Sequence, residues 1–177
     1  MKIEGAKILV TGGAGLISST TIDELLANEN PAEIVILDNM SRGTTRNLES
    51  ALKDERVKLI QGDIRDKNLV YKVTEGMDAV IHMAAIRITA CAADPREAME
   101  VMNDGTFNVI DAAHKAGVKK VLAASSASIL GLADSFPTTE DHHPYNNRTW
   151  YGASKIMLEG LLRSYNDMYG LNYVAMR

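Results

Sequence analysis

The sequence predicts an α/β domain built on a doubly wound parallel sheet with helices on both faces. Short apolar runs alternate along the chain with longer segments of helical periodicity, which is the pattern of repeated strand–helix–strand units. The first apolar run ends in a glycine-rich turn, Gly12–Gly15, that opens the first helical segment. Polar motifs follow nearly every strand, and ligands bind at that end of the strands in sheets of this kind.

The first half of the chain alternates three strands with three helices. The predicted elements are strand 7–10, helix 16–28, strand 33–37, helix 44–53, strand 57–60 and helix 66–75. Each strand is a short apolar run that ends in glycine or a polar residue. The first helix carries an apolar stripe and is ended by Asn30-Pro31, because the residue before proline disfavours helical backbone.

The second half continues the alternation and ends on a sixth strand. The predicted elements are strand 78–82, helix 95–116, strand 118–124, a loop over 131–148, helix 149–169 and strand 173–176. Gly117 and Gly170 end the two long helices, as glycine commonly does at a helix C-terminus. The loop contains Pro137 and Pro144, and no internal repeat or low-complexity tract occurs.

Composition excludes several classes of protein. The 177 residues suffice for one domain with a sizeable core, and 46% hydrophobic with 24% charged residues is ordinary for a soluble protein. A net charge of −4 offers no basic surface, so no nucleic-acid partner is expected. No apolar run approaches the roughly 20 residues of a membrane span, and no signal-peptide pattern opens the chain, so we expect a cytoplasmic protein that binds no membrane.

Cysteine and histidine give no metal-binding pattern. Cys91 is the only cysteine, so an intrachain disulfide and a cysteine-based zinc site are not expected, and we interpret it as a buried thiol. His82 is interpreted as packing at a strand end, and His142-His143 as part of a solvated loop. Neither has the spacing of metal ligands, and no metal is predicted.

The glycine turn and the acid after the second strand predict a dinucleotide site. Gly12 and Gly15 let the backbone approach a pyrophosphate, and the helix that follows presents amide donors and a positive dipole. Asp38 can accept hydrogen bonds from ribose hydroxyls, and its charge would repel a 2′-phosphate, which favours NAD over NADP. Asp63 and Ile64 follow the third strand and can meet the adenine.

Tyr151 and Lys155 form the second candidate site. Residues four apart lie on one face of a helix. A free phenol titrates near pH ~10, and an adjacent ammonium lowers that pKa because it favours the phenolate. Beside a nicotinamide, such a pair can move a proton while a hydride moves at a carbinol carbon.

Six motifs in order carry a resemblance to a known family. They are Thr11–Gly15, Asp38–Gly43, Gly62–Ile64, His82–Ala85, Ser125–Gly131 and Tyr151–Lys155. Together they resemble the extended short-chain dehydrogenase/reductase family, in its NAD-dependent sugar-nucleotide epimerase/dehydratase branch and especially the UDP-glucose 4-epimerases. The resemblance covers essentially the whole chain. It implies a Rossmann NAD-binding domain over residues 1–177, without the C-terminal substrate domain that family members add, so we expect a fragment.

The resemblance also implies a role for each matching residue. Tyr151 would be the general acid/base, Lys155 would hold the nicotinamide ribose and lower the tyrosine pKa, and Ser126 would hydrogen-bond the reacting hydroxyl. The implied cofactor-binding residues are Gly12, Gly15, Leu16, Ile17, Asp38, Asn39, Arg42, Gly43, Asp63, Ile64, Met83, Ala84, Ala85, Arg87, Tyr151 and Lys155.

The implied reaction is epimerisation at C4 of a nucleotide sugar, in particular a UDP-sugar, through a transient 4-keto intermediate and with no net redox change. An NAD-dependent dehydrogenase or reductase of a sugar or other secondary alcohol is an alternative, which differs in accumulating NADH. A non-catalytic NAD-binding module is a further alternative. Without a substrate domain, turnover by these 177 residues alone is not expected.

Some positions depart from the family pattern. Ser18 stands in place of the third glycine, Met102 in place of an asparagine, and Leu130 in place of a tyrosine. The 4,6-dehydratases of the branch carry an Asp-Glu pair after the active hydroxyl, where this chain has Ala127-Ser128. The resemblance also implies a homodimer through the helices at about 95–116 and 149–169.

Overall fold

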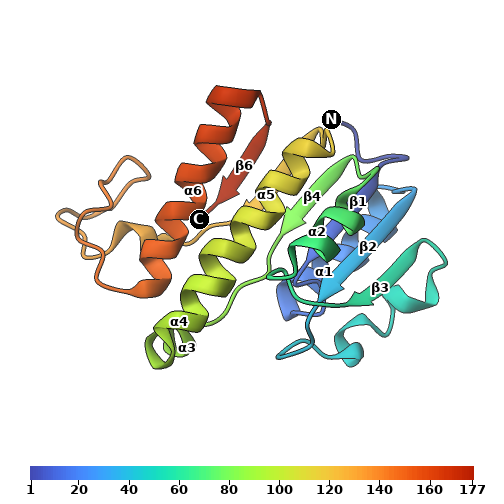
Figure 1. The fold of residues 1–177 in the computed structure, drawn as a ribbon, viewed down its shortest axis with the longest axis horizontal. Coiled ribbons are helices and arrows are strands. Elements are labelled where there is room, and N and C mark those ends of the chain that lie inside the picture. The colour runs from blue at the N-terminus through green and yellow to red at the C-terminus, as the bar shows by residue number, and fades with distance from the viewer.

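Six parallel strands form one sheet in the order β3-β2-β1-β4-β5-β6, in a computed structural model that describes residues 1–177 (Figure 1). The strands are β1 Lys7–Thr11, β2 Glu33–Asp38, β3 Val57–Gln61, β4 Ala79–His82, β5 Lys120–Ala124 and β6 Tyr173–Met176. The helices are α1 Leu16–Asn28, α2 Lys67–Thr74, α3 Ile88–Ala93, α4 Pro95–Ala98, α5 Thr106–Lys115 and α6 Trp150–Tyr169. The shorter helical segments are η1 Thr45–Leu48, η2 Ala51–Lys53, η3 Met99–Gly105 and η4 Ala127–Leu130. No helix is both long and apolar enough to cross a membrane.

The strand order confirms the doubly wound sheet. The chain builds β1, β2 and β3 outward in one direction and then returns to place β4 on the other side of β1. The order therefore reverses between β1 and β4, and the crevice at their carboxyl ends is where sheets of this kind bind ligands.

Strand side chains alternate between two buried layers. Leu9 and Val35 belong to a cluster that includes residues of α2, α5 and α6, whereas Ile8 and Ile34 belong to a cluster with α1 and the η1–η2 segment. Helices α2, α5 and α6 cover the near face of the sheet in Figure 1. Because the side-chain period of a strand is two, each buried strand needs apolar residues on both faces.

The helix predicted over 44–53 is wrong. The segment instead forms two short 3₁₀ turns, η1 and η2. Only Leu48 and Ala51 are buried there, so the segment has no apolar stripe of helical length to bury. Asn47 donates a hydrogen bond to the Ala14 carbonyl at 2.8 Å, which ties this segment to the glycine turn.

The long helix predicted over 95–116 is present but not uniform. Asp94 caps α4 by accepting hydrogen bonds from the amides of Arg96 and Glu97, and α4 continues through η3, a π-helical segment, into α5. Gly105 ends η3 against the Ile64 side chain, whose Cδ1 lies 2.7 Å from where a Cβ would be. The preceding helix α3 was not predicted.

His82 is buried at the end of β4, as the sequence predicts. Its side chain lies between the hydroxyls of Thr11, 2.7 Å from Nδ1, and Thr106, 3.1 Å from Nε2. Burial lowers its pKa to about 3, with a smaller contribution from the positive charge of Lys155. The imidazole is therefore neutral in the folded protein throughout the physiological range.

We expect this histidine to make the protein less stable in mild acid. The pKa of His82 is lower in the folded chain than the ~6.5 of an unfolded one, so the unfolded state binds the proton first. The free energy of unfolding therefore has its full value, as far as His82 is concerned, above pH ~6.5. It falls as the pH is lowered, by at most about 1.4 kcal/mol per pH unit. Urea unfolding between pH 7 and pH 5 measures this slope. His82→Asn should flatten it and His114→Asn should not, and an equal slope in all three proteins would contradict the interpretation.

Candidate dinucleotide and proton-transfer site

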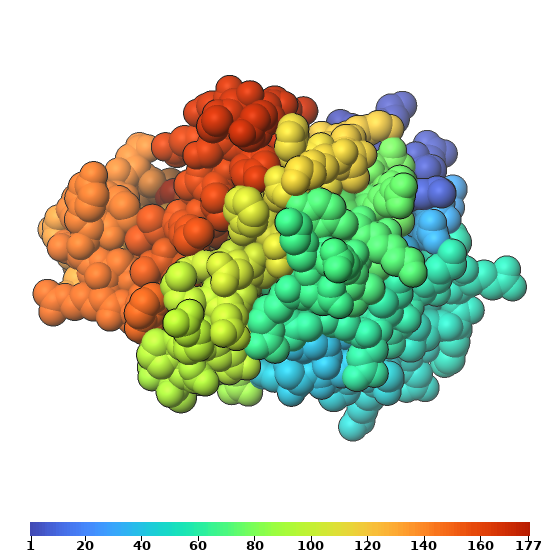
Figure 2. Space-filling view, in the orientation of Figure 1, coloured from blue at the N-terminus to red at the C-terminus, as the bar shows by residue number.

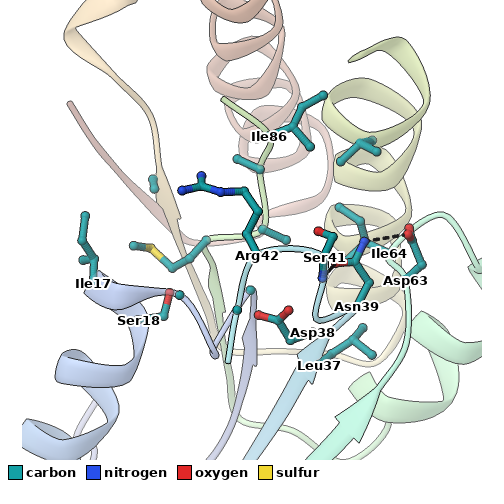
Figure 3. A pocket seen from close by; sticks show the side chains of 18 of the residues that line it. Ile17, Ser18, Leu37, Asp38, Asn39, Ser41, Arg42, Asp63, Ile64 and Ile86 are labelled. Carbon is teal, nitrogen blue, oxygen red and sulfur yellow. Dashed lines mark hydrogen bonds between the residues drawn. The ribbon is translucent and has the colours of Figure 1, made fainter. Parts of the chain in front are cut away.

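A cavity of about 610 Å³ opens at the carboxyl ends of the strands, around the reversal in strand order. It runs from the glycine turn and the end of β2 to Tyr151 and Lys155 on α6. Figure 3 shows Ile17 and Ser18 of α1 on one side and Asp38, Asn39 and Asp63 on the other. Its volume is within the range of small-molecule and cofactor sites.

The glycine turn brings two loops into close contact. Gly12 has a φ of +71°, and a Cβ there would lie 2.7 Å from the Ala84 backbone. Gly15 caps α1 without a side-chain hydrogen bond, and the first turn of the helix carries no acidic residue. Leu16 and Ile17 at this end are 76% and 69% exposed. The helix therefore presents unpaired amides and its positive dipole to the cavity, which suits a pyrophosphate.

Asp38 holds the glycine turn as well as lining the cavity. Its two carboxylate oxygens accept hydrogen bonds from the amides of Ala14, at 2.9 Å, and Met40, at 2.8 Å. A carboxylate offers about four acceptor positions, so two remain for ligand hydroxyls. Arg42 makes no ion pair with Asp38, and in Figure 3 its guanidinium points away from that carboxylate.

Asp63 is fixed at the β3 end of the cavity. It accepts hydrogen bonds from Asn39 Nδ2 at 3.0 Å and from Arg65 Nε and Nη2 at 3.0 and 2.9 Å. The hydrogen bond from Arg65 is the main cause that lowers its pKa to about 2. The carboxylate is thus ionised and oriented, with Ile64 beside it as an apolar wall.

Tyr151 and Lys155 lie on the first turns of α6, which Thr149 caps by accepting a hydrogen bond from the Gly152 amide at 3.0 Å. Lys155 is 3% exposed, and its Nζ lies 5.6 Å from the Tyr151 ring centroid. The ammonium donates to the Ala124 carbonyl at 2.6 Å. Burial lowers its pKa to about 8, so the amine can change its protonation state near neutral pH.

Ser125 and Ser126, the two serines that follow β5, have different surroundings. Ser125 lines the cavity and donates to Glu159, which also pairs with Arg177 at 2.8 and 3.0 Å. Ser126 does not line the cavity itself. Its Oγ accepts a hydrogen bond from the Ser128 amide at 3.0 Å and caps η4. Ser126 therefore follows the lining residue Ser125 in the chain, but its side chain is used in the cap.

All of the predicted cofactor residues except Arg87 line this one cavity. Arg87 lies in a smaller adjoining cavity of about 440 Å³, together with Arg42. The lining residues that sequence reasoning missed are Ser18, Leu37, Ser41, Asn47, Gly62, Ile86, Val101, Ala124 and Ser125. Most adjoin a predicted motif, and that adjacency is the signal that would have found them. Asn47 and Val101 lie outside the predicted motifs.

Comparison with known proteins finds a family that matches nearly the whole chain. Residues 8–177 match the family described as NAD dependent epimerase/dehydratase. The UDP-glucose 4-epimerase of Mycolicibacterium smegmatis is 37% identical over 169 residues, which are 94% of this chain and 53% of that protein. The chain spans about half the length of the curated relatives it matches.

Two solved structures are similar over almost the whole chain. The UDP-N-acetylglucosamine 4-epimerase of Methanobrevibacter ruminantium M1, in complex with UDP-N-acetylmuramic acid, has a TM-score of 0.91 at 29% identity and covers 98% of this chain and 55% of its own. The dTDP-glucose 4,6-dehydratase of Streptomyces venezuelae, with NAD bound, has a TM-score of 0.88 at 34% identity and covers 96% and 54%. Both epimerases and dehydratases therefore share this fold.

Proposed function

Because the chain belongs to the NAD-dependent epimerase/dehydratase family, we propose that it provides the NAD-binding and proton-transfer site of an enzyme that inverts the C4 hydroxyl of a nucleotide sugar. One observation carries the proposal. The glycine turn, the unpaired amides of α1, Asp38 and the Tyr151–Lys155 pair all line a single cavity. The cavity has the donors, the concave backbone and the acid that a bound dinucleotide requires.

The proposed roles are those that the family resemblance implies for these residues, and the position of Tyr151 and Lys155 on the cavity wall supports them. Bound NAD supplies a reversible hydride acceptor for the sugar C4 carbon. With the cofactor bound, the Tyr151 phenolate would take the proton of the C4 hydroxyl, and the resulting phenol would return it to the C4 oxygen after the keto sugar has turned over. Lys155 stabilises the phenolate through its charge and binds the nicotinamide ribose. The resemblance assigns Ser126 to hydrogen-bond the reacting hydroxyl, and because its side chain caps η4 outside the cavity, this role requires the side chain to turn when substrate binds.

We favour epimerisation over 4,6-dehydration because of the residues after Ser126. The dehydratases of the resembled branch carry an acid and a base there, whereas this chain has Ala127 and Ser128. Neither side chain can protonate or deprotonate the substrate at neutral pH. A UDP-sugar is the proposed substrate, since relatives named for UDP-sugar epimerisation match the chain.

Two alternatives remain distinguishable by experiment. A dehydrogenase or reductase on the same site would convert NAD to NADH in proportion to product, whereas an epimerase leaves the absorbance of NADH unchanged. A non-catalytic NAD-binding module would keep its biological activity when Tyr151 is replaced by phenylalanine. The position of Tyr151 and Lys155 on the wall of one cavity supports a catalytic role.

Calorimetric titration with NAD and then with NADP tests the cofactor site directly. We expect NAD to bind and NADP to bind much more weakly, because the Asp38 carboxylate repels a 2′-phosphate. Asp38→Asn should weaken NAD binding by roughly 10- to 100-fold, since it removes charge-assisted hydrogen bonds of about 1.5–3 kcal/mol. The substitution also places the asparagine NH₂, a hydrogen-bond donor, against the N–H of Ala14 or Met40, so one of these two hydrogen bonds is lost. Asp167→Asn, the same change on the exposed side of α6, should bind NAD like the unmodified chain. Equal NAD affinity in all three proteins would overturn the Asp38 assignment.

We also propose that the chain forms a homodimer through α5 and α6. These helices lie side by side (Figure 2), and their outer side exposes Phe107 at 41%, Met168 at 68% and Tyr169 at 52%. His114 of α5 stacks on Tyr169 of α6 with ring centroids 4.6 Å apart, so an aromatic contact joins the two helices at this surface. A surface helix buries one apolar stripe against the core, so these exposed apolar side chains are additional to that stripe.

Sedimentation at tens of micromolar protein should show a dimer, and Phe107→Glu with Met168→Glu should yield monomers. Leu52→Glu, at a leucine that is 39% exposed in η2 on the side of the sheet covered by α1, serves as the matched control and should remain dimeric. A purely monomeric unmodified chain would contradict the proposal.

A further inference from the structure

The loop between η4 and α6 gathers two histidines and a carboxylate outside the dinucleotide cavity. One possible ligand atom each from Asp134, His142 and His143 lies within 4.8 Å of the other two. The sequence predicts no metal at the adjacent histidines. That reasoning misses the third group because Asp134 lies eight residues earlier in irregular chain, where no periodicity marks it.

The ring of His142 is already oriented as a metal ligand requires. Its Nδ1 lies 2.7 Å from the His143 carbonyl oxygen, which can only accept, so Nδ1 carries the proton, and the Nε2 lone pair accepts a hydrogen bond from the Asp134 amide. Nε2 faces Asp134, 3.0 Å from its amide nitrogen and 4.0 Å from its Oδ2. Metal-binding histidines usually donate their other ring N–H to a carbonyl or carboxylate in this way.

Asp134 and His143 complete the set. His143 Nε2 lies 2.7 Å from Asp134 Oδ2, and the second carboxylate oxygen, Oδ1, accepts a hydrogen bond from Asn146 Nδ2 at 2.7 Å. Asn146 also donates to the Leu132 carbonyl at 3.0 Å, which closes the base of the loop. The carboxylate is therefore supported from outside, as ligating carboxylates are.

We propose that Asp134, His142 and His143 form a binding site for one divalent transition-metal ion of the zinc type. Two imidazoles and one carboxylate suit Zn²⁺ and leave a fourth position for water, whereas Mg²⁺ and Ca²⁺ prefer oxygen ligands. The segment 131–149 carries three acidic residues and one arginine, so its charge also favours a cation.

Binding requires a modest rearrangement. Metal–ligand bonds of about 2.0–2.1 Å set tetrahedral ligand atoms roughly 3.3 Å apart, so His142 Nε2 moves closer to Asp134 Oδ2 and releases the Asp134 amide. The proton on His143 Nε2 transfers to Nδ1, which gives up its 3.2 Å hydrogen bond from the Tyr145 amide. The net number of bound protons does not change.

The site would couple the ion to the start of α6. Asn147, a few residues on, donates to the Ser128 carbonyl and accepts from the Thr149 amide at 3.0 Å, and Thr149 caps the helix that carries Tyr151. A bound ion would therefore stiffen the loop that joins Ser126 to Tyr151. The inference itself does not depend on the proposed function, because it rests on loop residues that line no part of the cavity.

Calorimetric titration of the full chain with Zn²⁺ at pH 7.5, without NAD, tests the site. We expect one ion to bind per chain. Asp134→Asn, His142→Asn and His143→Asn should each weaken binding by at least about 10- to 100-fold, because losing even a group that only hydrogen-bonds a metal ligand costs that much affinity. His114→Asn is the matched control, because it removes a histidine that stacks on α6 away from the loop, and it should bind like the unmodified chain.

Each result bears on the proposal. Co²⁺ should give the intense visible bands of a four- or five-coordinate site, and these should disappear in Asp134→Asn. Absence of Zn²⁺ binding, or equal binding by the control and the three loop variants, would overturn the site. NAD titration of the same variants should be unchanged, so failure of the metal site and failure of the proposed function are separable, and normal NAD binding also shows that a variant has folded.

Discussion

Tyr151→Phe is expected to lower the rate of C4 epimerisation by about 10²- to 10⁴-fold, the usual contribution of a positioned acid or base. NAD affinity should stay nearly unchanged. The substitution removes only the phenolic oxygen, and the ring remains next to the Lys155 ammonium, 5.6 Å away in the structure. Interconversion of UDP-glucose and UDP-galactose, followed by proton NMR with NAD present, measures the rate.

The chain offers a matched control for this change. Tyr145 is 86% exposed on the loop before α6, so Tyr145→Phe makes the same chemical change with no expected loss. Because the chain spans about half the length of its curated relatives, the assay uses the longest natural polypeptide that contains these residues. Full activity of Tyr151→Phe would remove the tyrosine from the mechanism and favour the non-catalytic alternative.

Gly12→Ala is expected to weaken NAD binding by about 100-fold or more, which corresponds to roughly 3 kcal/mol. The added Cβ would lie 2.7 Å from both N and Cα of Ala84. Since neither backbone can yield alone, the glycine turn and the loop after β4 must separate, and both line the cavity. The positive φ adds about 1–2 kcal/mol of strain, so the free energy of unfolding should fall by roughly 2–4 kcal/mol.

Gly117→Ala separates the two effects. Gly117 has a φ of +69°, close to that of Gly12, but a Cβ there would meet nothing within 4 Å. This variant should lose only the strain of about 1–2 kcal/mol and keep its NAD affinity. Calorimetry with NAD and urea unfolding measure both quantities, and similar NAD affinities for the two variants would show that close approach at Gly12 is unimportant.

The sheet could be predicted from sequence because its signals are local. Runs such as Lys7–Thr11 and Glu33–Asp38 are short, apolar and bounded by turn residues, and the order of strands and helices admits few topologies. The glycine turn and Asp38 were predictable for the same reason. Their chemistry depends on a position directly after a strand, and the parallel sheet brings such positions to one edge.

The misassigned segments depend on contacts that sequence periodicity does not carry. The turns over 45–53 follow the bond from Asn47 to the Ala14 carbonyl, across a large separation in the chain. The π-helical segment η3 ends at Gly105, where Ile64 occupies the space of a missing Cβ. Asp38 also accepts a hydrogen bond from the Ala14 amide. The sequence could not predict this second role, because every residue except proline carries a backbone N–H.

The placement of β1 in the middle of the sheet sets the order in which the protein can assemble. β1 leaves the ribosome before both of its neighbours in the sheet, which are β2 and the much later β4. The edge of β1 that pairs with β4 therefore stays unpaired while some seventy residues are synthesised. Parallel strands so far apart in sequence pair slowly, and an unpaired strand edge can meanwhile bind another chain. The edge strand β6 is the last of the six strands to be synthesised and pairs with β5. The edge of β1 that awaits β4 is therefore the part of the sheet at which incomplete chains are expected to associate.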